Sequence, residues 1–397
     1  MNESPKNEYF AIFGGGGIRG ISYCGAYKAL IENNIGLTGY AGSSIGAVFA
    51  TLIAVGYSWQ ESYEILCEAG FDVFKDININ FANKISFSKG NIFLEWIREK
   101  IEKKFYGKNY EKGSVAPVAF KDIDKQLVIF SVDLTNMKFK EFSTVKTPDF
   151  EIATAVRASV SMPGLFTPLE LDDCLIVDGD LLKSSPLWRL SDTIKDVEAR
   201  ILEFRLEDNE TSGKTDNSIE YINRVYNAFC GFATDYVIDV YKNKDKFDYI
   251  KIDTPNVSVV DFLIPKEKKQ ELFDIGYNTV NKYFKEFYPI KKKLLKEKYE
   301  NLLKHLNKLS REFGRFNIIN SYLSLCEIFV YLCEEKKYID SRIYDEICNF
   351  KNNFTKEFST YNFLGFKGAK IKNKDEFSRQ LIKITNDIVL KIESLNP

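Results

Sequence analysis

The sequence predicts an α/β fold, in which a mostly parallel sheet lies between two layers of helices, followed by a C-terminal all-helical extension. Up to residue 288, short apolar segments typical of buried strands alternate with segments of helical periodicity. This alternation is typical of a parallel sheet covered on both faces. After Pro289 no strand pattern remains, and long segments rich in Lys, Glu and Leu follow. We therefore expect two domains, residues 1–288 and residues 289–397.

The expected elements follow in order along the chain. Residues 9–13 are an apolar run that ends at a glycine cluster, which predicts a buried strand leading into a turn. Ser58, with Glu61 three residues later, predicts a capped helix start. The remaining strands are expected at residues 37–41, 126–133, 138–144, 200–206 and 249–253. Helices are expected at residues 21–33, 45–55, 91–105, 150–160 and 219–241, and in the extension at 290–309, 320–333, 341–353 and 376–394.

Composition narrows the class of protein. The 397 residues are 45% hydrophobic, enough for one large core or two modest ones. Because 55 Lys and Arg balance 56 Asp and Glu, nucleic acid is not expected as a partner. Seven Cys without a C-x-x-C pair, and an N-terminus without a signal pattern, favour a cytoplasmic protein with reduced thiols. The longest apolar stretch, residues 47–57, is too short to span a bilayer.

A glycine cluster, GGGGIRG from Gly14 to Gly20, follows the first predicted strand and precedes a helix. Its spacing matches a dinucleotide-binding turn, but no acidic residue stands between Glu32 and Glu61 to hold a ribose. Ile21 stands where a phosphate-binding loop needs Lys. Two interpretations stay open: a tight turn without a ligand, or a nest of backbone amides that binds an oxyanion.

A second motif, GSSIG from Gly42 to Gly46, places Ser44 at the centre of a G-x-S-x-G turn between a predicted strand and a predicted helix. Small residues let such a turn bend sharply and lift the serine oxygen to the edge of a sheet. Ser43 lacks the flanking glycines and is the less favoured nucleophile. Ser44 is therefore a candidate for nucleophilic catalysis.

A serine nucleophile needs a base, and the chain has a single His, His305. His305 lies in a charged amphipathic segment of the extension, which is typical of a solvated helix face, so a carboxylate is the better candidate. Asp178 and Gly179 stand between two apolar runs. This pattern favours a hairpin turn, but a carboxylate at a strand end could also act as the base of a serine.

Together these elements resemble the patatin-like phospholipase family over residues 9–287. The glycine cluster resembles the family's oxyanion loop, GSSIG resembles its nucleophile elbow, and Asp178-Gly179 resembles its Asp-Gly catalytic element. The segment RASVSMPGLFTPLEL, from Arg157 to Leu171, resembles the proline-containing block that precedes this Asp.

The resemblance implies a lipid acyl hydrolase, usually acting on glycerophospholipids without calcium, and we expect no cofactor and no metal. It implies a dyad that needs no His, with Ser44 as the nucleophile and Asp178 as the base. The remaining site residues that it implies are Gly15, Gly16, Gly17 and Arg19 in the oxyanion hole, Gly42 and Gly46 in the elbow, and Gly179 in the Asp-Gly element.

Two residues depart from the family pattern. Gly14 stands where the loop often begins with Asp, and Asp180 stands where Gly or Ala often follows the Asp-Gly pair. Asp180 therefore adds a second carboxylate beside Asp178.

The expected substrate is a phospholipid or another lipid ester, met through peripheral contact by a cytoplasmic protein acting at the membrane surface. Residues 265–304 are Lys-rich, as in helices that lie on anionic membranes, but interrupting Glu residues favour a solvated helix face. Residues 289–397 are a candidate for binding an activating ligand or protein, as in a regulated toxin or immune effector. Three other classes stay open: a dinucleotide-binding oxidoreductase, an inactive lipid-binding protein and an acyl transferase.

Overall fold

The computed structural model describes residues 7–69, 76, 86–182, 200–207, 246–255, 257, 261, 263–314, 318–363 and 374–395. The chain divides into two compact units, Met1–Asp239 with Phe247–Tyr283, and Val240–Lys246 with Phe284–Pro397. The helix predicted at residues 219–241 falls outside the described residues. The domain boundary predicted after residue 288 stays a prediction.

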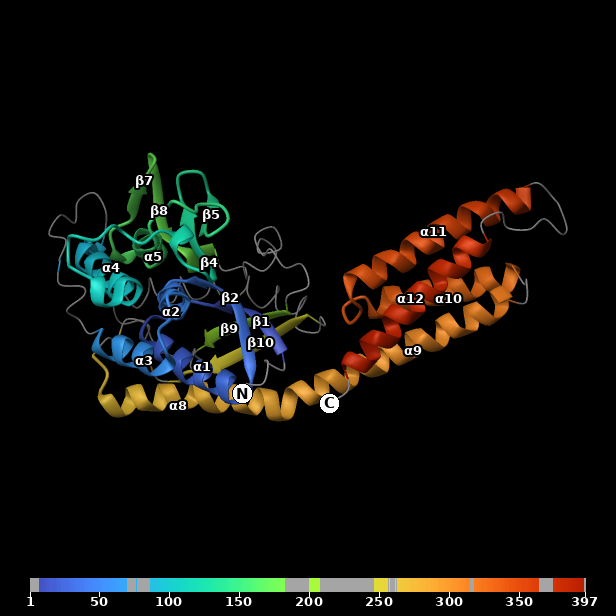
Figure 1. Ribbon diagram of the computed structural model, residues 1–397, viewed down its shortest axis with the longest axis horizontal. Coiled ribbons are helices and arrows are strands. Elements are labelled where there is room, and N and C mark those ends of the chain that lie inside the picture. Colours follow the sequence, from blue (N-terminus) through green and yellow to red (C-terminus); the bar gives the residue numbers. More distant parts are fainter. Residues whose placement is uncertain are drawn as a thin grey trace, which may run out of the picture. The chain divides into compact units, whose positions relative to one another are not determined.

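Among the residues that the structure describes, the first unit is built on an eight-stranded sheet (Figure 1). Its parallel part has the order β10 (Phe247–Asp253), β9 (Arg200–Glu207), β1 (Asn7–Phe13), β2 (Ile35–Ser43) and β4 (Gln126–Asp133). The antiparallel part consists of β8 (Cys174–Asp178) beside β4, β7 (Leu169–Leu171) beside β8, and β5 (Lys138–Ser143), which also pairs with β4. Two short strands, β3 (Ser86–Ser88) and β6 (Gly164–Phe166), form a separate parallel pair. The mostly parallel sheet expected from the sequence is confirmed.

Both faces of this sheet are covered. Every residue of β1 from Tyr9 to Phe13 is at most 2% exposed, although successive side chains of a strand point to opposite faces. Such burial requires a layer on each side, as in sheets built from strand–helix–strand units. The α-helices that the structure describes in this unit are α1 (Ser22–Glu32), α2 (Ile45–Ala54), α3 (Trp59–Glu68), α4 (Asn91–Tyr106), α5 (Ile152–Ser159) and α8 (Lys266–Lys282).

Helix α8 lies alongside α1, and two glycines set how closely the helices approach (Figure 1). A Cβ at Gly25 of α1 would overlap the carbonyl oxygen of Phe273, and a Cβ at Gly276 of α8 would overlap that of Ser22. Since the obstacles are backbone atoms, no side-chain rotation can make room. The two helix backbones therefore touch directly, and α8 holds the helix that follows the glycine cluster.

An aromatic cluster fixes the carboxyl end of β1. The ring of Phe13 stacks on Phe204 of β9 with 5.2 Å between centroids, and it meets Phe49 of α2 edge-on at 5.0 Å. Tyr23 of α1 also meets Phe13 edge-on, and its hydroxyl donates to the carbonyl oxygen of Gly14 at 2.8 Å. Each aromatic pair contributes about 0.5–1.5 kcal/mol beyond its buried area. The cluster thus joins β1, β9, α1 and α2 where the glycine cluster begins.

The second unit is helical in its described part, which confirms the all-helical extension. Its helices are α9 (Tyr288–Gly314), α10 (Ile318–Glu335), α11 (Ser341–Phe363) and α12 (Lys374–Ser394). Buried side chains recur on α9 at helical spacing, at Leu295, Tyr299, Leu302, Leu306, Leu309 and Phe313. They form a core of their own with side chains from the other three helices, so this unit does not depend on a sheet for its burial.

Two local predictions have different outcomes. The capping box is confirmed, because Ser58 Oγ accepts the Glu61 amide at 3.2 Å and the Ser58 amide donates to the Glu61 carboxylate at 2.7 Å. The hairpin turn at Asp178-Gly179 is wrong, because Gly179–Leu182 is a 3₁₀ helix that follows β8. A Cβ at Gly179 would overlap the carbonyl oxygen of Phe130 on β4, so a tertiary contact sets this glycine's conformation instead of a hairpin.

Gly25→Ala is expected to destabilise the protein, because the new Cβ must push two helix backbones apart. Overpacking of this kind costs about 1–3 kcal/mol, whereas Gly→Ala in an unobstructed helix gains up to about 1 kcal/mol. The midpoint of thermal unfolding should fall for Gly25→Ala. It should stay unchanged or rise for Gly314→Ala, where a Cβ meets nothing within 4 Å. Equal midpoints for the two variants would contradict direct backbone contact between α1 and α8.

Candidate active site

Ser44 lies between the end of β2 and the start of α2, with φ 53° and ψ −127°. Positive φ is strained for any residue with a side chain, and such strain persists only where the surrounding structure enforces it. A Cβ at Gly42 would overlap the backbone of Gly46, and a Cβ at Gly46 would overlap the carbonyl oxygen of Phe13. The glycines of the GSSIG motif thus let α2 approach β1 and β2, and Ser44 takes the turn of a nucleophile elbow.

Ser159, at the end of α5, holds this turn. The backbone amide of Ser44 donates to Ser159 Oγ at 3.0 Å, and Ser159 Oγ donates to the carbonyl oxygen of Phe130 on β4 at 2.6 Å. Ser159 is fully buried. Its hydroxyl therefore bridges the elbow and the neighbouring strand, a role that sequence reasoning did not identify within the segment RASVSMPGLFTPLEL.

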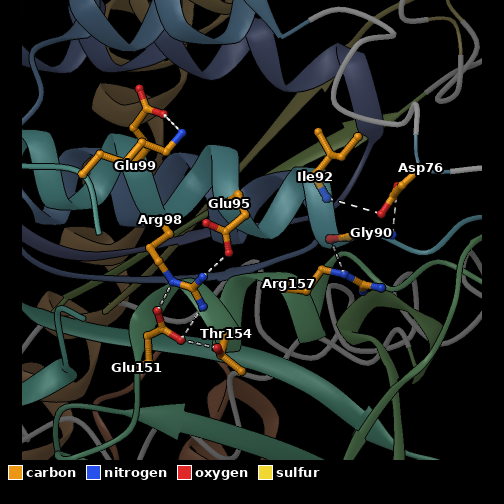
Figure 2. Close-up of polar contacts among 10 residues, drawn as sticks. Asp76, Gly90, Ile92, Glu95, Arg98, Glu99, Glu151, Thr154 and Arg157 are labelled. Carbon is orange, nitrogen blue, oxygen red and sulfur yellow. Dashed lines mark hydrogen bonds and ion pairs between the residues drawn. The ribbon is translucent and has the colours of Figure 1, made fainter. Parts of the chain in front are cut away.

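Arg157 anchors the end of α5, as Figure 2 shows for its contact with Gly90 before α4. Its guanidinium donates to the carbonyl oxygens of Gly90 at 3.0 Å, Lys89 at 2.7 Å and Thr167 at 2.7 Å, and to Ser161 Oγ at 2.6 Å. Burial lowers the pKa of Arg157 to about 10. The arginine therefore remains charged near neutral pH and fixes α5 through backbone contacts on two other segments.

The other end of α5 is fixed to α4 through Arg98 (Figure 2). Its Nε lies 2.6 Å from the carboxylate of Glu151, the residue before α5. The Glu151 carboxylate raises the pKa of Arg98. Asp76 accepts the amides of Asn91 at 2.6 Å and Ile92 at 3.3 Å, where a carboxylate is favoured at the start of α4. Both ends of α5 are thus held by α4 and the residues before it.

The glycine cluster forms a loop after β1 and enters a 3₁₀ helix, Gly17–Ile21. Gly17 has φ 58°, a conformation that favours glycine. A Cβ at Gly15 would lie 3.0 Å from the Cβ of Ser44, so the loop and the elbow are adjacent. Arg19 is buried, and its Nε donates to the carbonyl oxygen of Gly16 at 3.1 Å. This contact helps to hold the loop in place.

Asp178 ends β8, and its side chain is buried. Its amide donates to the carbonyl oxygen of Ser161 at 3.1 Å, so the last residue of α5 holds Ser44 and a residue just after α5 holds Asp178. The pairing of β2 with β4 sets Ser43 beside Phe130, and the pairing of β4 with β8 sets Ser131 beside Asp178. One strand, β4, therefore separates the elbow from the candidate base.

A buried charge network that sequence reasoning missed surrounds these turns. Asp180 Oδ2 accepts the Gly15 amide at 3.0 Å, and its Oδ1 accepts the hydroxyl hydrogen of Ser43 and lies 3.7 Å from Arg205 Nη1. Arg205 Nε donates to Glu203 at 2.8 Å. Burial alone would lower the pKa of Arg205, but the two carboxylates outweigh burial and raise it. Charged residues inside the otherwise apolar segment at 200–206 were the available sequence signal.

His305 belongs to α9 of the second unit, where its ring lies 5.3 Å from the ring of Tyr331. A tilted ring contact with a tyrosine of α10 fits a side chain on a packed helix face. Within the part of the chain that the structure describes, no group of three or more His, Cys, Asp or Glu side chains is placed to hold a metal ion.

Fold and site define a class: α/β proteins in which a parallel strand runs through a strained G-x-S-x-G turn into a helix. Within this class, the model of the patatin-like phospholipase family matches residues 11–190, a range that contains the glycine loop, the elbow and Asp178. The match confirms the resemblance inferred from the motifs and supports lipid hydrolase activity. Glu203 and Arg205 lie outside the matched range.

Three known proteins illustrate the similarity. The YqhO protein of Bacillus subtilis is 24% identical over 295 residues, which cover 70% of this chain and 98% of YqhO. The protein named "Probable lipid hydrolase 463L" of Invertebrate iridescent virus 6 is 24% identical over 185 residues, covering 46% of this chain and 63% of its own length. The structure of VipD from Legionella pneumophila aligns with a TM-score of 0.46 at 16% identity, covering 98% of this chain and 91% of VipD.

Ser159→Ala is expected to destabilise the protein, because it leaves the Ser44 amide and the Phe130 carbonyl without the hydroxyl that they share. An unsatisfied buried polar group costs about 1–3 kcal/mol. Thermal unfolding should therefore show a lower midpoint for Ser159→Ala and no change for Ser114→Ala, which alters an exposed serine. Two unchanged midpoints would show that the bridge does not hold the elbow.

Proposed function

We propose that this protein is a phospholipase of the A type, which cleaves carboxylic ester bonds with a Ser44–Asp178 dyad through an acyl-enzyme. The observation that carries the proposal is the meeting of three turns at one edge of the sheet. Ser44 occupies the strained turn, Gly15 lies next to it, and Asp178 lies across β4. An acyl hydrolase needs a nucleophile, an oxyanion site and a base, and the three turns offer a candidate for each.

In the proposed reaction, Ser44 Oγ attacks the ester carbonyl carbon while the Asp178 carboxylate takes the hydroxyl proton. The carbonyl oxygen becomes an oxyanion, which backbone amides of the glycine loop stabilise. The bond to the alcohol then breaks, and the proton on Asp178 passes to the leaving oxygen. Water next attacks the acyl-Ser44 carbonyl and gives a proton to Asp178. Release of the fatty acid returns that proton to Ser44 Oγ.

The other functions considered from the sequence find less support. The pyrophosphate of a dinucleotide would need the amides of the glycine loop, but the Gly15 amide donates to Asp180, whose carboxylate repels phosphates. An inactive lipid-binding protein has no need of the strained backbone at Ser44. An acyl transferase would share the acyl-enzyme and differ in the acceptor that replaces water.

The proposed substrate is a membrane phospholipid, met at the membrane surface by peripheral contact. None of the described helices combines the length and the apolar character needed to cross a bilayer. We propose that the second unit gates or targets the hydrolase by binding an activating ligand or protein, as in a regulated toxin or immune effector. The motifs that carry the proposed chemistry all lie between Gly14 and Asp178, which supports a separate task for this unit.

Ser44→Ala should lower ester hydrolysis about a thousandfold or more, because removal of a serine nucleophile leaves only binding and oxyanion stabilisation. Turnover would be measured on phospholipid vesicles and on a short soluble ester. A fluorophosphonate probe should label wild type at Ser44 and fail to label the variant. Wild-type turnover in a folded Ser44→Ala protein would exclude Ser44 as the nucleophile.

Asp178→Asn should lower hydrolysis at least about a hundredfold, the usual contribution of a positioned base. His305→Ala is the matched control, because it removes the only imidazole of the chain from a helix of the second unit. Its turnover on the short soluble ester should equal that of wild type. The reverse result, an active Asp178→Asn and an inactive His305→Ala, would replace the dyad with a His-dependent mechanism.

A further inference from the structure

We propose that Asp180 is a positioning residue, which joins the glycine loop, the elbow and the Asp-Gly turn into one site. The inference rests on the proposed function and extends it to a residue where the family pattern often has Gly or Ala. Asp180 acts through other residues and does not itself touch the substrate.

Asp180 contacts all three turns. One carboxylate oxygen accepts the Gly15 amide of the loop at 3.0 Å, and the other accepts the hydroxyl hydrogen of Ser43, the residue before Ser44. Its own amide donates to Asp178 Oδ1 at 2.8 Å. Asp180 is only 4% exposed, so water does not compete effectively for these contacts. A single residue thus sets the positions of the loop, the elbow and the candidate base relative to one another.

Arg205 stabilises the buried carboxylate of Asp180. An isolated carboxylate is costly to bury, but Arg205 Nη1 lies 3.7 Å from Asp180 Oδ1, and Glu203 fixes the same guanidinium at 2.8 Å. Arg205 also packs on the loop, because a Cβ at Gly14 would lie 2.9 Å from its Cδ. The first two glycines of the loop therefore pack directly against charged side chains, Gly14 against Arg205 and Gly15 against Asp180.

In the described part of the chain, these contacts divide the loop into an anchored part, Gly15, and a part with free amides, Gly16 and Gly17. The Gly15 amide is committed to Asp180, and a Cβ at Gly15 would overlap the same carboxylate. The amides of Gly16 and Gly17 have no acceptor among the residues that the structure describes. The geometry therefore assigns the oxyanion to Gly16 and Gly17, while Gly15 anchors the loop. Loss of Asp180 would release Gly15 and shift the donors relative to Ser44.

The test compares Asp180→Ala, Asp180→Asn and Asp248→Ala. Asp248 is a matched control, because it is also buried and paired with an arginine, Arg200 at 3.0 Å, but lies near the amino end of β10. A fluorophosphonate probe titrates reactive Ser44, and hydrolysis of a short soluble ester then gives kcat per labelled site. Thermal unfolding is measured in parallel.

Asp180→Ala should lower kcat per labelled site by about 100-fold with KM within about twofold, since misplacement by about 1 Å costs this much. Asp180→Asn keeps one acceptor oxygen and should lose less than about tenfold. Asp248→Ala should lower the unfolding midpoint and leave kcat per labelled site unchanged. If Asp180→Ala and Asp180→Asn lower only the midpoint, or raise kcat, Asp180 is not a positioning residue.

If Asp180→Ala does not fold, the proposal is tested instead with Ser43→Ala, alone and combined with Asp180→Asn. Ser43→Ala removes one partner of the carboxylate, so its effect on kcat per labelled site should be largely lost in the Asp180→Asn background. Additive effects of the two substitutions would overturn the proposal. A wild-type protein that neither hydrolyses esters nor labels at Ser44 would instead refute the proposed function.

Discussion

The candidate site depends on direct backbone contact at the carboxyl edge of the sheet. Gly46, in the first turn of α2, lies against the carbonyl oxygens of Phe13 and Gly14, and Gly42 lies against the backbone of Gly46. Because neither place has room for a Cβ, α2 sits on the ends of β1 and β2 without side chains between them. The chain then has a single residue, Ser44, in which to turn from strand to helix, and this explains its positive φ. The packing of α2 on β1 and β2 offsets the free-energy cost of that strain.

Polar groups from distant parts of the sequence secure the turn. Ser159 takes the Ser44 amide from the side of α5, and Asp180 takes the Ser43 hydroxyl from the residues after β8. Each of these groups is backed by a buried arginine, Arg157 for the end of α5 and Arg205 for Asp180. A buried guanidinium is stable only when oxygens surround it, so removal of any partner disturbs the others. The elbow is therefore stable as part of an assembly and not as an isolated motif.

Sequence reasoning succeeded where a local pattern decides the structure. The apolar segment at 126–133 and the glycines around Ser44 report on neighbours close in the chain, and the expected strand and turn are both present. It failed at Asp178-Gly179, where contact with β4 overrides the usual hairpin preference of the pair. The role of Arg205 was not identified, because its contact with Asp180 depends on the register of β9 beside β1. That register pairs Phe204 with Phe13 and is not visible in the sequence.

Charge around the loop limits where an oxyanion could bind. Asp180 places a negative charge at Gly15, which would oppose a second negative charge at the same amide. Arg19 brings a positive charge to the same loop, and its contact with the Gly16 carbonyl oxygen keeps the guanidinium directed at the backbone. The amides of Gly16 and Gly17, at the start of a 3₁₀ helix, have no acceptor among the described residues. In the proposed reaction, these fixed amides would stabilise the oxyanion without the reorganisation that water would need, so anchoring by a carboxylate is compatible with an oxyanion site in the same loop.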